Sequence, residues 1–466
     1  MSAIVNTLPP EIVQLIFGLL DLEQLVRCLR VCKEWHRILI SLPHLWRHVQ
    51  LSSRFQGAPE RYAQALTNLI HLAGDHLQWL KLDIELSEVL GIQALQLIAA
   101  NGCKHLEGLE LNNTSGPEER LLLLRALRNI GPMTAMSYLQ LYCLEINMDD
   151  VVHLFDLFPN LTYLDLSDSV LYDSGDYTSS IPSGPAHRHH RYHHYNQRYH
   201  RTTRLKSLTL NHIEGASSAV FGCLLQSCPQ LEQFHCRGAL LSYEIIQHLN
   251  RYNRSLRVLA YGLCAGHHAD QHDFVIPPPP VMLEIGLESV LLEQVNDQDL
   301  AAIVSYSAYH YTLSKLDIRS CFIPDDTMAQ LLLNSSSSNG GWSSLRQLDL
   351  SSVTGLSLPG LFTFLDACPN LEKLSFKDIP WWRVTNATLD RWTHYKNLVD
   401  IRYFGQPESI SQAAIQQLIA AKYAVLQQQR PGALHFEFNR HTRIHIQFPT
   451  QYSVDDLILL SRLLDE

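Results

Sequence analysis

Residues 161–166 read LTYLDL, and this LxxLxL pattern decides the fold because it recurs along most of the chain. Stretches that keep the pattern, with conservative replacements, begin at Leu77, Leu106, Met136, Leu161, Leu205, Leu231, Leu256, Leu287, Leu313, Leu345, Leu371 and Leu398. Successive starts lie 25 to 32 residues apart, with a single longer step of 44. Similarity at a nearly constant period predicts a stacked array of repeats in this chain of 466 residues.

Each repeat has the pattern of a strand followed by a helix. Alternation in the LxL part places both apolar side chains on one face of a strand. Residues 219–226 have the pattern of a helix, and prolines at 159, 229 and 369 end helices just before the next strand. One unit cannot bury its own apolar face, so units must stack. We therefore predict an α/β solenoid, with parallel strands on the concave face and helices outside.

The repeat resembles leucine-rich repeats, whose units are about 20–29 residues long. The Cys-Pro-x-Leu endings that begin at Cys228 and Cys368 resemble the cysteine-containing subclass found in F-box proteins. The resemblance covers about residues 70–430, and the units that begin at Leu256 and Leu287 match it only loosely. We place the solenoid, with about twelve repeats, at residues 51–433.

Residues 434–466 are interpreted as a C-terminal cap of the solenoid. Residues 434–448 alternate between apolar and polar side chains, a pattern typical of a β-hairpin. A repeat array needs such a cap because its last strand would otherwise present an open edge.

Residues 7–50 have the pattern of three short helices. Thr7 followed by Pro9-Pro10-Glu11 indicates a helix start, and Asp21 begins a second amphipathic stretch. A third helix contains Trp35 and ends before Pro43. About forty residues bury little surface by themselves, so their apolar faces predict contact with something else.

This segment resembles an F-box. The motif residues are Leu8-Pro9-x-Glu11-Ile12, Ile16-Phe17, Leu25, Val31-Cys32-Lys33-x-Trp35 and Leu45-Trp46. The resemblance implies docking on the Skp-type adaptor of a cullin–RING ubiquitin ligase. It implies these adaptor-binding residues: Leu8, Pro9, Ile12, Ile16, Phe17 and Val31. Trp35 and Trp46 are expected to hold the three helices together. A plain helical cap on the repeats is the alternative, because it would need the same apolar faces.

The long repeat step contains an insert at residues 168–204, rich in histidine and arginine between 187 and 201. Such a composition can bind metal or nucleic acid, but no fixed ligand spacing is present. We interpret the insert as a disordered surface loop. A second histidine cluster at 267–273 is also read as a loop, and we predict no metal site.

Side chains that alternate with the core leucines are predicted to line the concave face. Early repeats place aromatic and acidic groups there, whereas late repeats mix basic and acidic groups. Such a surface suits a protein or peptide partner. Trp381 and Trp382 are either binding residues or core residues beneath the next repeat. The target-binding candidates are Trp79, Tyr138, Tyr163, Lys315, Arg319, Lys373, Trp381, Trp382 and Arg402.

Composition and motifs exclude several functional classes. The net charge of −10 argues against a general nucleic-acid binder. No apolar run reaches the roughly 18 residues of a membrane span, and the first residues do not resemble a signal peptide. The ten cysteines form no CxxC pair and are expected to be reduced, buried thiols. No GxSxG, P-loop, HExxH or GxGxxG motif occurs, so we expect neither catalysis nor a cofactor.

The sequence thus predicts a non-catalytic receptor subunit of a Skp–cullin–F-box ubiquitin ligase, present in the cytoplasm, the nucleus or both. The F-box would bind the adaptor, and the repeats would bind a target protein that the sequence does not identify. A leucine-rich-repeat scaffold without a ligase role is the alternative.

Overall fold

The computed structural model describes residues 9–52, 59–112, 117–172, 202–238, 243–262, 286–295, 312–335, 342–377, 385–405, 411–429, 432–438 and 442–448. The chain divides into two compact units, Met1–Ser255 (unit 1) and Leu256–Glu466 (unit 2). Both units are α/β, with parallel strands that alternate with helices. No helix among these residues is both long and apolar enough to cross a bilayer.

Unit 1 begins with short helices and continues as a parallel sheet. The first helices are α2 (Pro10–Gly18), α3 (Leu22–Cys28), α4 (Lys33–Ile40) and the 3-10 helix η1 (Pro43–Trp46). The sheet consists of β1 (His48–Leu51), β2 (Trp79–Leu82), β3 (Gly108–Asn112), β4 (Tyr138–Tyr142), β6 (Tyr163–Asp165), β8 (Ser207–Thr209) and β9 (Gln233–Arg237), in that order. The connecting helices are α5 (Pro59–Ala73), the short η2 (Gly74–His76), α6 (Ile84–Asn101), α7 (Pro117–Ile130), α8 (Met148–Leu157), α10 (Ser218–Ser227) and α11 (Tyr243–Tyr252).

Unit 2 repeats the same arrangement and ends in a hairpin. Its strands are β10 (Val258–Gly262), β11 (Ser289–Glu293), β12 (Lys315–Arg319), β13 (Gln347–Asp349), β14 (Lys373–Lys377), β15 (Asp400–Gly405), β16 (Gly432–Phe438) and β17 (Thr442–Phe448). Its helices are α13 (Asp325–Ser335), α14 (Leu358–Asp366), α15 (Asn386–Thr393) and α16 (Gln412–Gln429). β17 pairs antiparallel with β16, so the predicted hairpin is confirmed.

Every stretch with the LxxLxL pattern contains a strand, as predicted. Each of the twelve stretches contains a strand that begins two residues after its first apolar residue. The two loosely matching units are also in register, since Val258 pairs with Ser289 and Leu259 with Val290. Leu161, Leu164 and Leu166 are at most 1% exposed. Burial stabilises the fold by about 1.5–3 kcal/mol for each such side chain.

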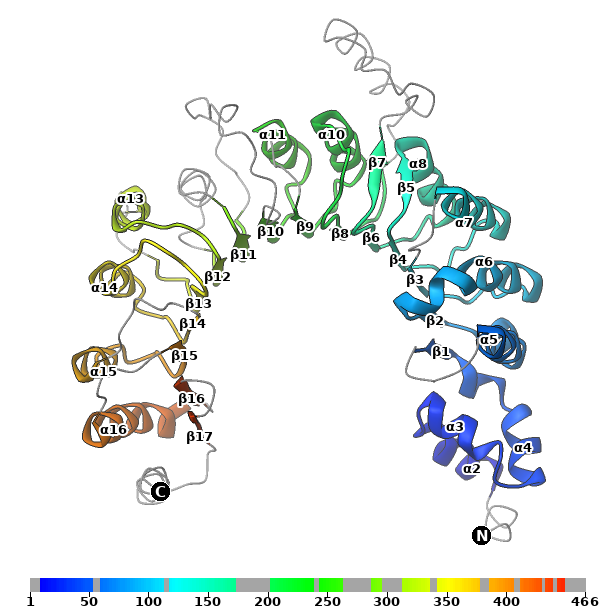
Figure 1. Ribbon diagram of the computed structural model, residues 1–466, viewed down its shortest axis with the longest axis horizontal. Coiled ribbons are helices and arrows are strands. Elements are labelled where there is room, and N and C mark those ends of the chain that lie inside the picture. Colours follow the sequence, from blue (N-terminus) through cyan, green and yellow to red (C-terminus); the bar gives the residue numbers. More distant parts are fainter. Residues whose placement is uncertain are drawn as a thin grey trace, which may run out of the picture. The chain divides into compact units, whose positions relative to one another are not determined.

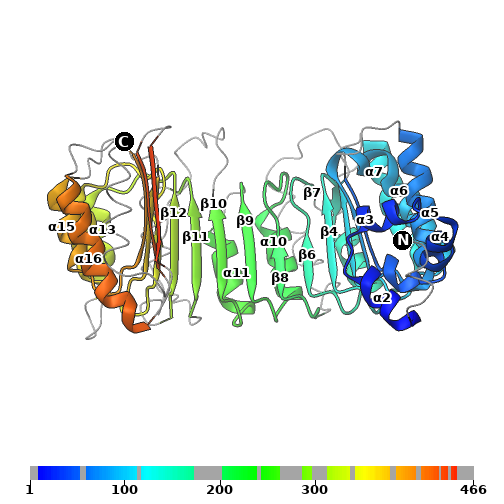
Figure 2. The ribbon, with the colours of Figure 1, turned by 90° about the horizontal axis from the view of Figure 1, so that it is seen from below.

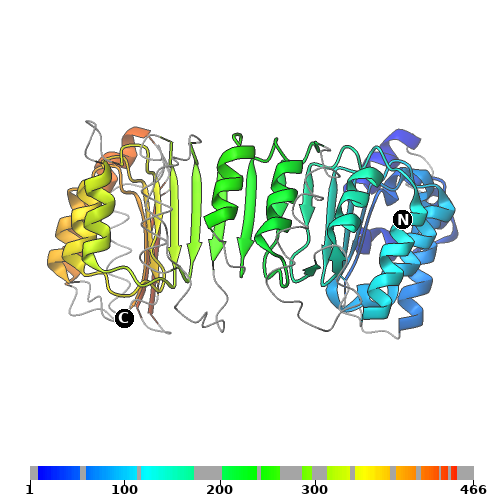
Figure 3. The same cartoon turned by 90° about the horizontal axis from the view of Figure 1, so that it is seen from above.

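Helices cover one face of the strands in each unit (Figure 1). Figure 2 looks onto β6, β8 and β9 of unit 1, and Figure 3 shows the green helices α10 and α11 on their other side. We call the strand face turned away from the helices the open face. Its side chains are those that alternate with the buried leucines.

A left-handed residue follows the strand at the same place in successive repeats. In unit 1, Cys143, Asp168 and His212 have φ values of 54°, 58° and 55°. The N–H of Asp168 donates to the carbonyl of Asn211 at 2.8 Å, which links this residue to the next repeat. In unit 2, the N–H of Ser320 donates in the same way to Ser351, at 3.0 Å. The repeat therefore imposes this strained conformation on residues other than glycine.

Two boundaries differ from the sequence prediction. β1 lies at the end of the segment assigned to the three helices, and it pairs with β2, so it is already the first strand of the sheet. Residues 170–172 form strand β7 within the predicted insert and pair in parallel with β5 (Glu145–Asn147), so the insert as drawn began too early. Residues 173–201, where its histidines lie, and the cap residues 449–466 are outside the described part.

Candidate functional site

The three N-terminal helices have local sequence signals that fix their ends. Pro10 opens α2, where a missing N–H costs nothing. Asp21 and Gln24 form a capping box at the start of α3, in which the Gln24 N–H donates to the Asp21 carboxylate at 2.8 Å. At α4, the Sγ of Cys32 accepts from the N–H of Trp35 at 3.4 Å.

A small core joins these helices to one another and to η1. The Phe17 ring meets the Trp35 ring edge to face at 5.3 Å, and Phe17 is only 2% exposed. Trp46 is fully buried, and its indole N–H donates to the carbonyl of Leu39 at 3.0 Å. Phe17 was predicted to bind a partner, and that assignment is wrong for this structure because its side chain belongs to the core.

Apolar side chains remain on the outside of the same helices. The described residues include nine large apolar side chains that are strongly exposed, and seven of them lie between residues 12 and 40. These seven, which we call the apolar patch, are Ile12, Leu15, Ile16, Leu19, Val26, Val31 and Ile40. Leu15 and Leu19 are 66% and 86% exposed. Such a concentration on one small segment indicates a surface that another molecule covers.

The predicted adaptor-binding residues fall into three groups. Pro9, Ile12, Ile16 and Val31 are exposed, Phe17 is buried, and Leu8 lies outside the described residues.

Sequence reasoning left Leu15, Leu19, Val26 and Ile40 out of the predicted interface. Helix α2 has apolar residues on two opposite sides, since Val13 and Phe17 fill its buried side while Leu15 lies on the other. A helix of that kind must bury both sides, and this signal predicts the missing residues of α2.

On the open face of unit 1, three aromatic side chains form a continuous stack. The rings of Trp79 and Tyr138 lie 4.8 Å apart, and those of Tyr138 and Tyr163 lie 4.2 Å apart and nearly parallel, at 2°. Trp79 reaches Tyr138 across the intervening strand β3, because the residue between them in the register is Gly108. The structure thus brings together the three target-binding candidates of unit 1.

A charged row runs beside this aromatic stack. The Trp79 indole N–H donates to Glu110 at 3.1 Å, and Lys81 forms an ion pair with the same carboxylate. This contact fixes the indole and leaves no net charge at that end of the stack.

Asp165 lies at the other end and is a buried carboxyl group. It is 5% exposed, and its Oδ2 accepts from the hydroxyls of Tyr142 and Tyr163 at 3.3 and 3.4 Å. Burial raises the pKa of both tyrosines, and the charge of Asp165 adds to the rise. Both hydroxyls therefore stay protonated and act as donors at neutral pH.

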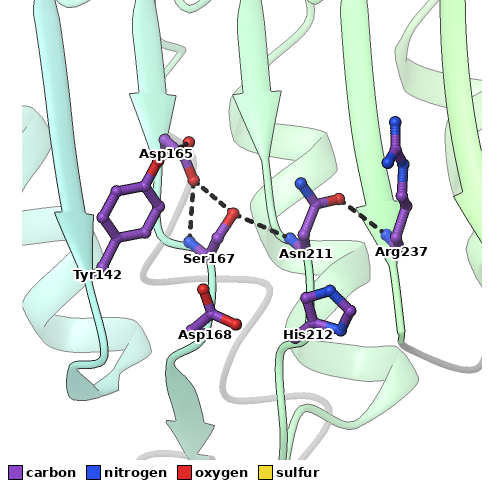
Figure 4. Close-up of a pocket in the computed structure, with 7 residues that line it drawn as sticks. All are labelled: Tyr142, Asp165, Ser167, Asp168, Asn211, His212 and Arg237. Carbon is purple, nitrogen blue, oxygen red and sulfur yellow. Dashed lines mark hydrogen bonds between the residues drawn. The ribbon is translucent and has the colours of Figure 1, made fainter. Parts of the chain in front are cut away.

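A pocket lies next to Asp165, where β4, β6, β8 and β9 end (Figure 4). Its volume is about 330 Å³. The Ser167 hydroxyl donates to Asp165 at 2.6 Å and accepts from the Asn211 N–H at 3.3 Å. The Asn211 side-chain oxygen in turn accepts from the Arg237 N–H at 3.0 Å. Equivalent residues of three repeats are thus joined into one wall.

Four target-binding candidates lie on the open face of unit 2: Lys315, Arg319, Lys373 and Arg402. Arg319 donates two hydrogen bonds of 2.7 Å to Asp317, two residues earlier on the same strand. Arg402 contacts Asp400 in the same way, at 3.3 Å. Burial raises the pKa of Asp317 even though Arg319 opposes the rise. These arginines are therefore held against the strand, partly neutralised by their own neighbours.

Trp381 and Trp382 lie outside the described residues. Within the part of the chain that the structure describes, no three histidine, cysteine, aspartate or glutamate side chains lie together in a way that could hold a metal ion. None of the cysteines in the described part of the chain takes part in a disulfide, and Cys103, Cys228 and Cys368 are buried. Burial raises the pKa of Cys103 to about 11, so this thiol is unreactive at neutral pH.

Comparison with known proteins connects the N-terminal helices to one family. No curated protein matches this chain. Among solved structures, a chain from the crystal structure of the Rad7 and Elc1 complex in yeast matches with a TM-score of 0.37 and 18% identity, over 85% of this chain and 96% of that chain. Residues 5–52, which include α2, α3, α4 and η1, match the family model described as F-box-like.

Proposed function

We propose that this protein is the substrate-receptor subunit of an SCF-type ubiquitin ligase. Its F-box-like segment would bind a Skp-type adaptor, and its repeats, which we assign to the leucine-rich class, would bind a target protein. The observation that carries the proposal is the apolar patch, which lies on the segment that matches the F-box-like model.

The energetics of the patch support a permanent or frequent partner. Leu15 and Leu19 each leave most of their side chain in water, at 66% and 86% exposure. Covering a leucine or isoleucine completely stabilises a complex by about 1.5–3 kcal/mol, so several such side chains suffice for a specific interface. The core contacts of Phe17 and Trp46 hold these helices in shape without the partner.

The repeats would hold the target protein in position and would take no part in the chemical reaction. The aromatic stack from Trp79 to Tyr163 and the ion pairs of unit 2 offer a fixed, mixed surface of the kind that binds proteins. A target held there would meet the conjugating enzyme at a raised effective concentration. For this role the protein would act in the cytoplasm, the nucleus or both, with a cullin–RING complex as its wider partner.

The test is capture of a purified Skp-type adaptor by the full chain. Full length is required because β1 pairs with β2, and a fragment that ends near residue 55 would leave β1 unpaired. The double change Leu15→Asp and Leu19→Asp should reduce capture at least tenfold, because two carboxylates would be buried without partners. Both side chains are exposed, so folding should be retained.

Leu122 provides a matched control, since it is an exposed leucine (46%) on α7, outside the F-box-like segment. Leu122→Asp should leave capture unchanged. The proposal fails if the unaltered protein does not bind the adaptor, or if the double variant binds as well as the control. In that case the scaffold without a ligase role becomes the better description.

A further inference from the structure

The pocket at the ends of β4, β6, β8 and β9 has an excess of negative charge. Asp165 and Asp168 line it, and Arg237 is the opposing permanent cation. Neither aspartate takes part in an ion pair among the described residues. Figure 4 shows the Arg237 guanidinium pointing away from Asp168. A positive group is therefore what the aspartate side of the pocket lacks.

Asp165 is built rigidly into the pocket floor. Its Oδ1 accepts from the N–H and the hydroxyl of Ser167, at 2.9 and 2.6 Å, and its Oδ2 accepts from the Tyr142 hydroxyl. These hydrogen bonds fix the orientation of the carboxyl group, which is only 5% exposed. Because little water reaches it, its charge acts on the pocket with less screening than a surface carboxylate would.

Asp168 supplies a second, accessible carboxylate at the rim. Its backbone has φ +58°, and its N–H donates to the carbonyl of Asn211 at 2.8 Å. This hydrogen bond to the next repeat fixes the backbone of Asp168, while its side chain is exposed. A ligand could reach this carboxylate directly.

The pocket also adjoins the aromatic stack through Asp165. Tyr142 lines the pocket, and its hydroxyl meets the Asp165 oxygen that also accepts from Tyr163, the last ring of the stack. An extended polypeptide on the open face could therefore contact the rings while one of its side chains entered the pocket. Aromatic faces beside carboxylates favour cationic side chains.

We propose that this pocket binds an arginine or lysine side chain of a polypeptide lying on the open face of unit 1. Asp168 forms the ion pair at the rim, Asp165 attracts the charge from the floor, and Tyr142 forms one wall. An anionic side chain would meet two carboxylates and is disfavoured. The identification of this polypeptide as the ligase target rests on the proposed function, whereas peptide binding itself does not.

The experiment titrates the full-length protein with blocked pentapeptides, Ac-Ala-Ala-X-Ala-Ala-amide, by calorimetry at low salt. X is arginine, citrulline or glutamate, and citrulline matches arginine in shape without its charge. The measurement is made at pH 8, above the ordinary pKa of histidine side chains. The arginine peptide should bind about tenfold more tightly than the citrulline peptide, and the glutamate peptide should bind weakest.

Asp168→Asn tests the rim residue, because asparagine tolerates the same positive φ. It should weaken arginine-peptide binding about fivefold and leave citrulline-peptide binding unchanged. Glu107→Gln, which removes an exposed charge just before β3, is the matched control and should have no effect.

Three outcomes would overturn the inference: equal affinity for arginine and citrulline peptides, preference for glutamate, or no measurable binding of any peptide. An unchanged affinity in Asp168→Asn would likewise exclude its assigned role. The Leu15→Asp, Leu19→Asp protein should bind the arginine peptide normally, so a failure of adaptor capture and a failure of the pocket are distinguishable.

Discussion

The indole ring of Trp79 lies directly over Gly108, on the neighbouring strand, and a β-carbon built on that glycine would overlap the ring. Gly108 pairs with Trp79 on one side and with Tyr138 on the other. The absence of a side chain at this one position lets the indole cross a strand and stack on the tyrosine. The aromatic stack of unit 1 therefore depends on a glycine as much as on its rings.

Gly108→Ala should displace Trp79 from Tyr138. Alanine ordinarily strengthens a strand relative to glycine, but here the methyl group would collide with a ring that Glu110 also holds. We expect a loss of about 1–2 kcal/mol in the free energy of unfolding, measured with urea, together with a changed near-ultraviolet circular dichroism of the indole.

A double-mutant cycle separates the collision from other effects of alanine. In a Trp79→Ala background the ring is gone, so Gly108→Ala should cost little or nothing. Gly18→Ala is a control at a glycine with no atom within 4 Å of the added carbon. Equal losses for Gly108→Ala with and without Trp79 would show that the ring does not require this glycine.

The regular part of the fold follows from the sequence because it depends on one strong signal. Each strand has apolar residues at alternate positions, and the LxL part of LxxLxL shows this alternation directly in the sequence. β5 and β7 were missed because they lie outside that pattern. β1 was missed because His48–Leu51 follows the helical segment without an LxxLxL start.

The candidate sites were predictable only in part, because contacts between neighbouring repeats do not follow from the pattern within one repeat. Alternation with the leucines identified Trp79, Tyr138 and Tyr163, but not that Gly108 lets them stack. Ser167, Asn211 and Arg237 follow their strands, and only the turn that joins the repeats brings them into one wall. Phe17 was misplaced because periodicity does not distinguish the buried from the exposed side of a helix that has apolar residues on both.

The left-handed conformation of Ser320 predicts a stabilising substitution. Ser320 has φ +53°, and its N–H is bonded to the next repeat, so the conformation is imposed from outside. Ser320→Gly should raise the free energy of unfolding by about 0.5 kcal/mol, because glycine adopts positive φ without strain. Ser320→Val should lower it by about 1–2 kcal/mol, because a β-branched side chain fits this region worst.

Urea unfolding of both variants checks this order. Ser343 is the control, since it is also partly exposed but is not among the residues with positive φ. There, glycine should be neutral or destabilising because it only adds entropy to the unfolded chain. If Ser320→Gly lowers the free energy of unfolding as much as Ser343→Gly does, the backbone conformation of Ser320 carries no strain.

Lys422 on α16 predicts a dependence of stability on pH. Its side chain is 1% exposed, and its Nζ donates to the carbonyl of Tyr395 at 2.5 Å. Burial lowers the pKa of Lys422 to about 8, whereas an unfolded lysine titrates near 10.4. Between these values the unfolded state binds more protons, so the contribution of Lys422 to stability improves as pH rises. Below about pH 8 the full cost of burying the charge is present.

Lys422→Met removes that charge and keeps most of the side-chain volume. At pH 7 it should raise the free energy of unfolding by about 1–2 kcal/mol, after loss of the hydrogen bond to Tyr395. The gain should shrink between pH 8 and pH 9.5, because the lysine then becomes neutral in the folded protein. Lys396→Met, at an exposed position, controls for the loss of one positive charge and should show neither effect. A gain in Lys422→Met that stays constant from pH 7 to pH 9.5 would mean that Lys422 does not titrate in this range, and that its burial costs less than the geometry implies.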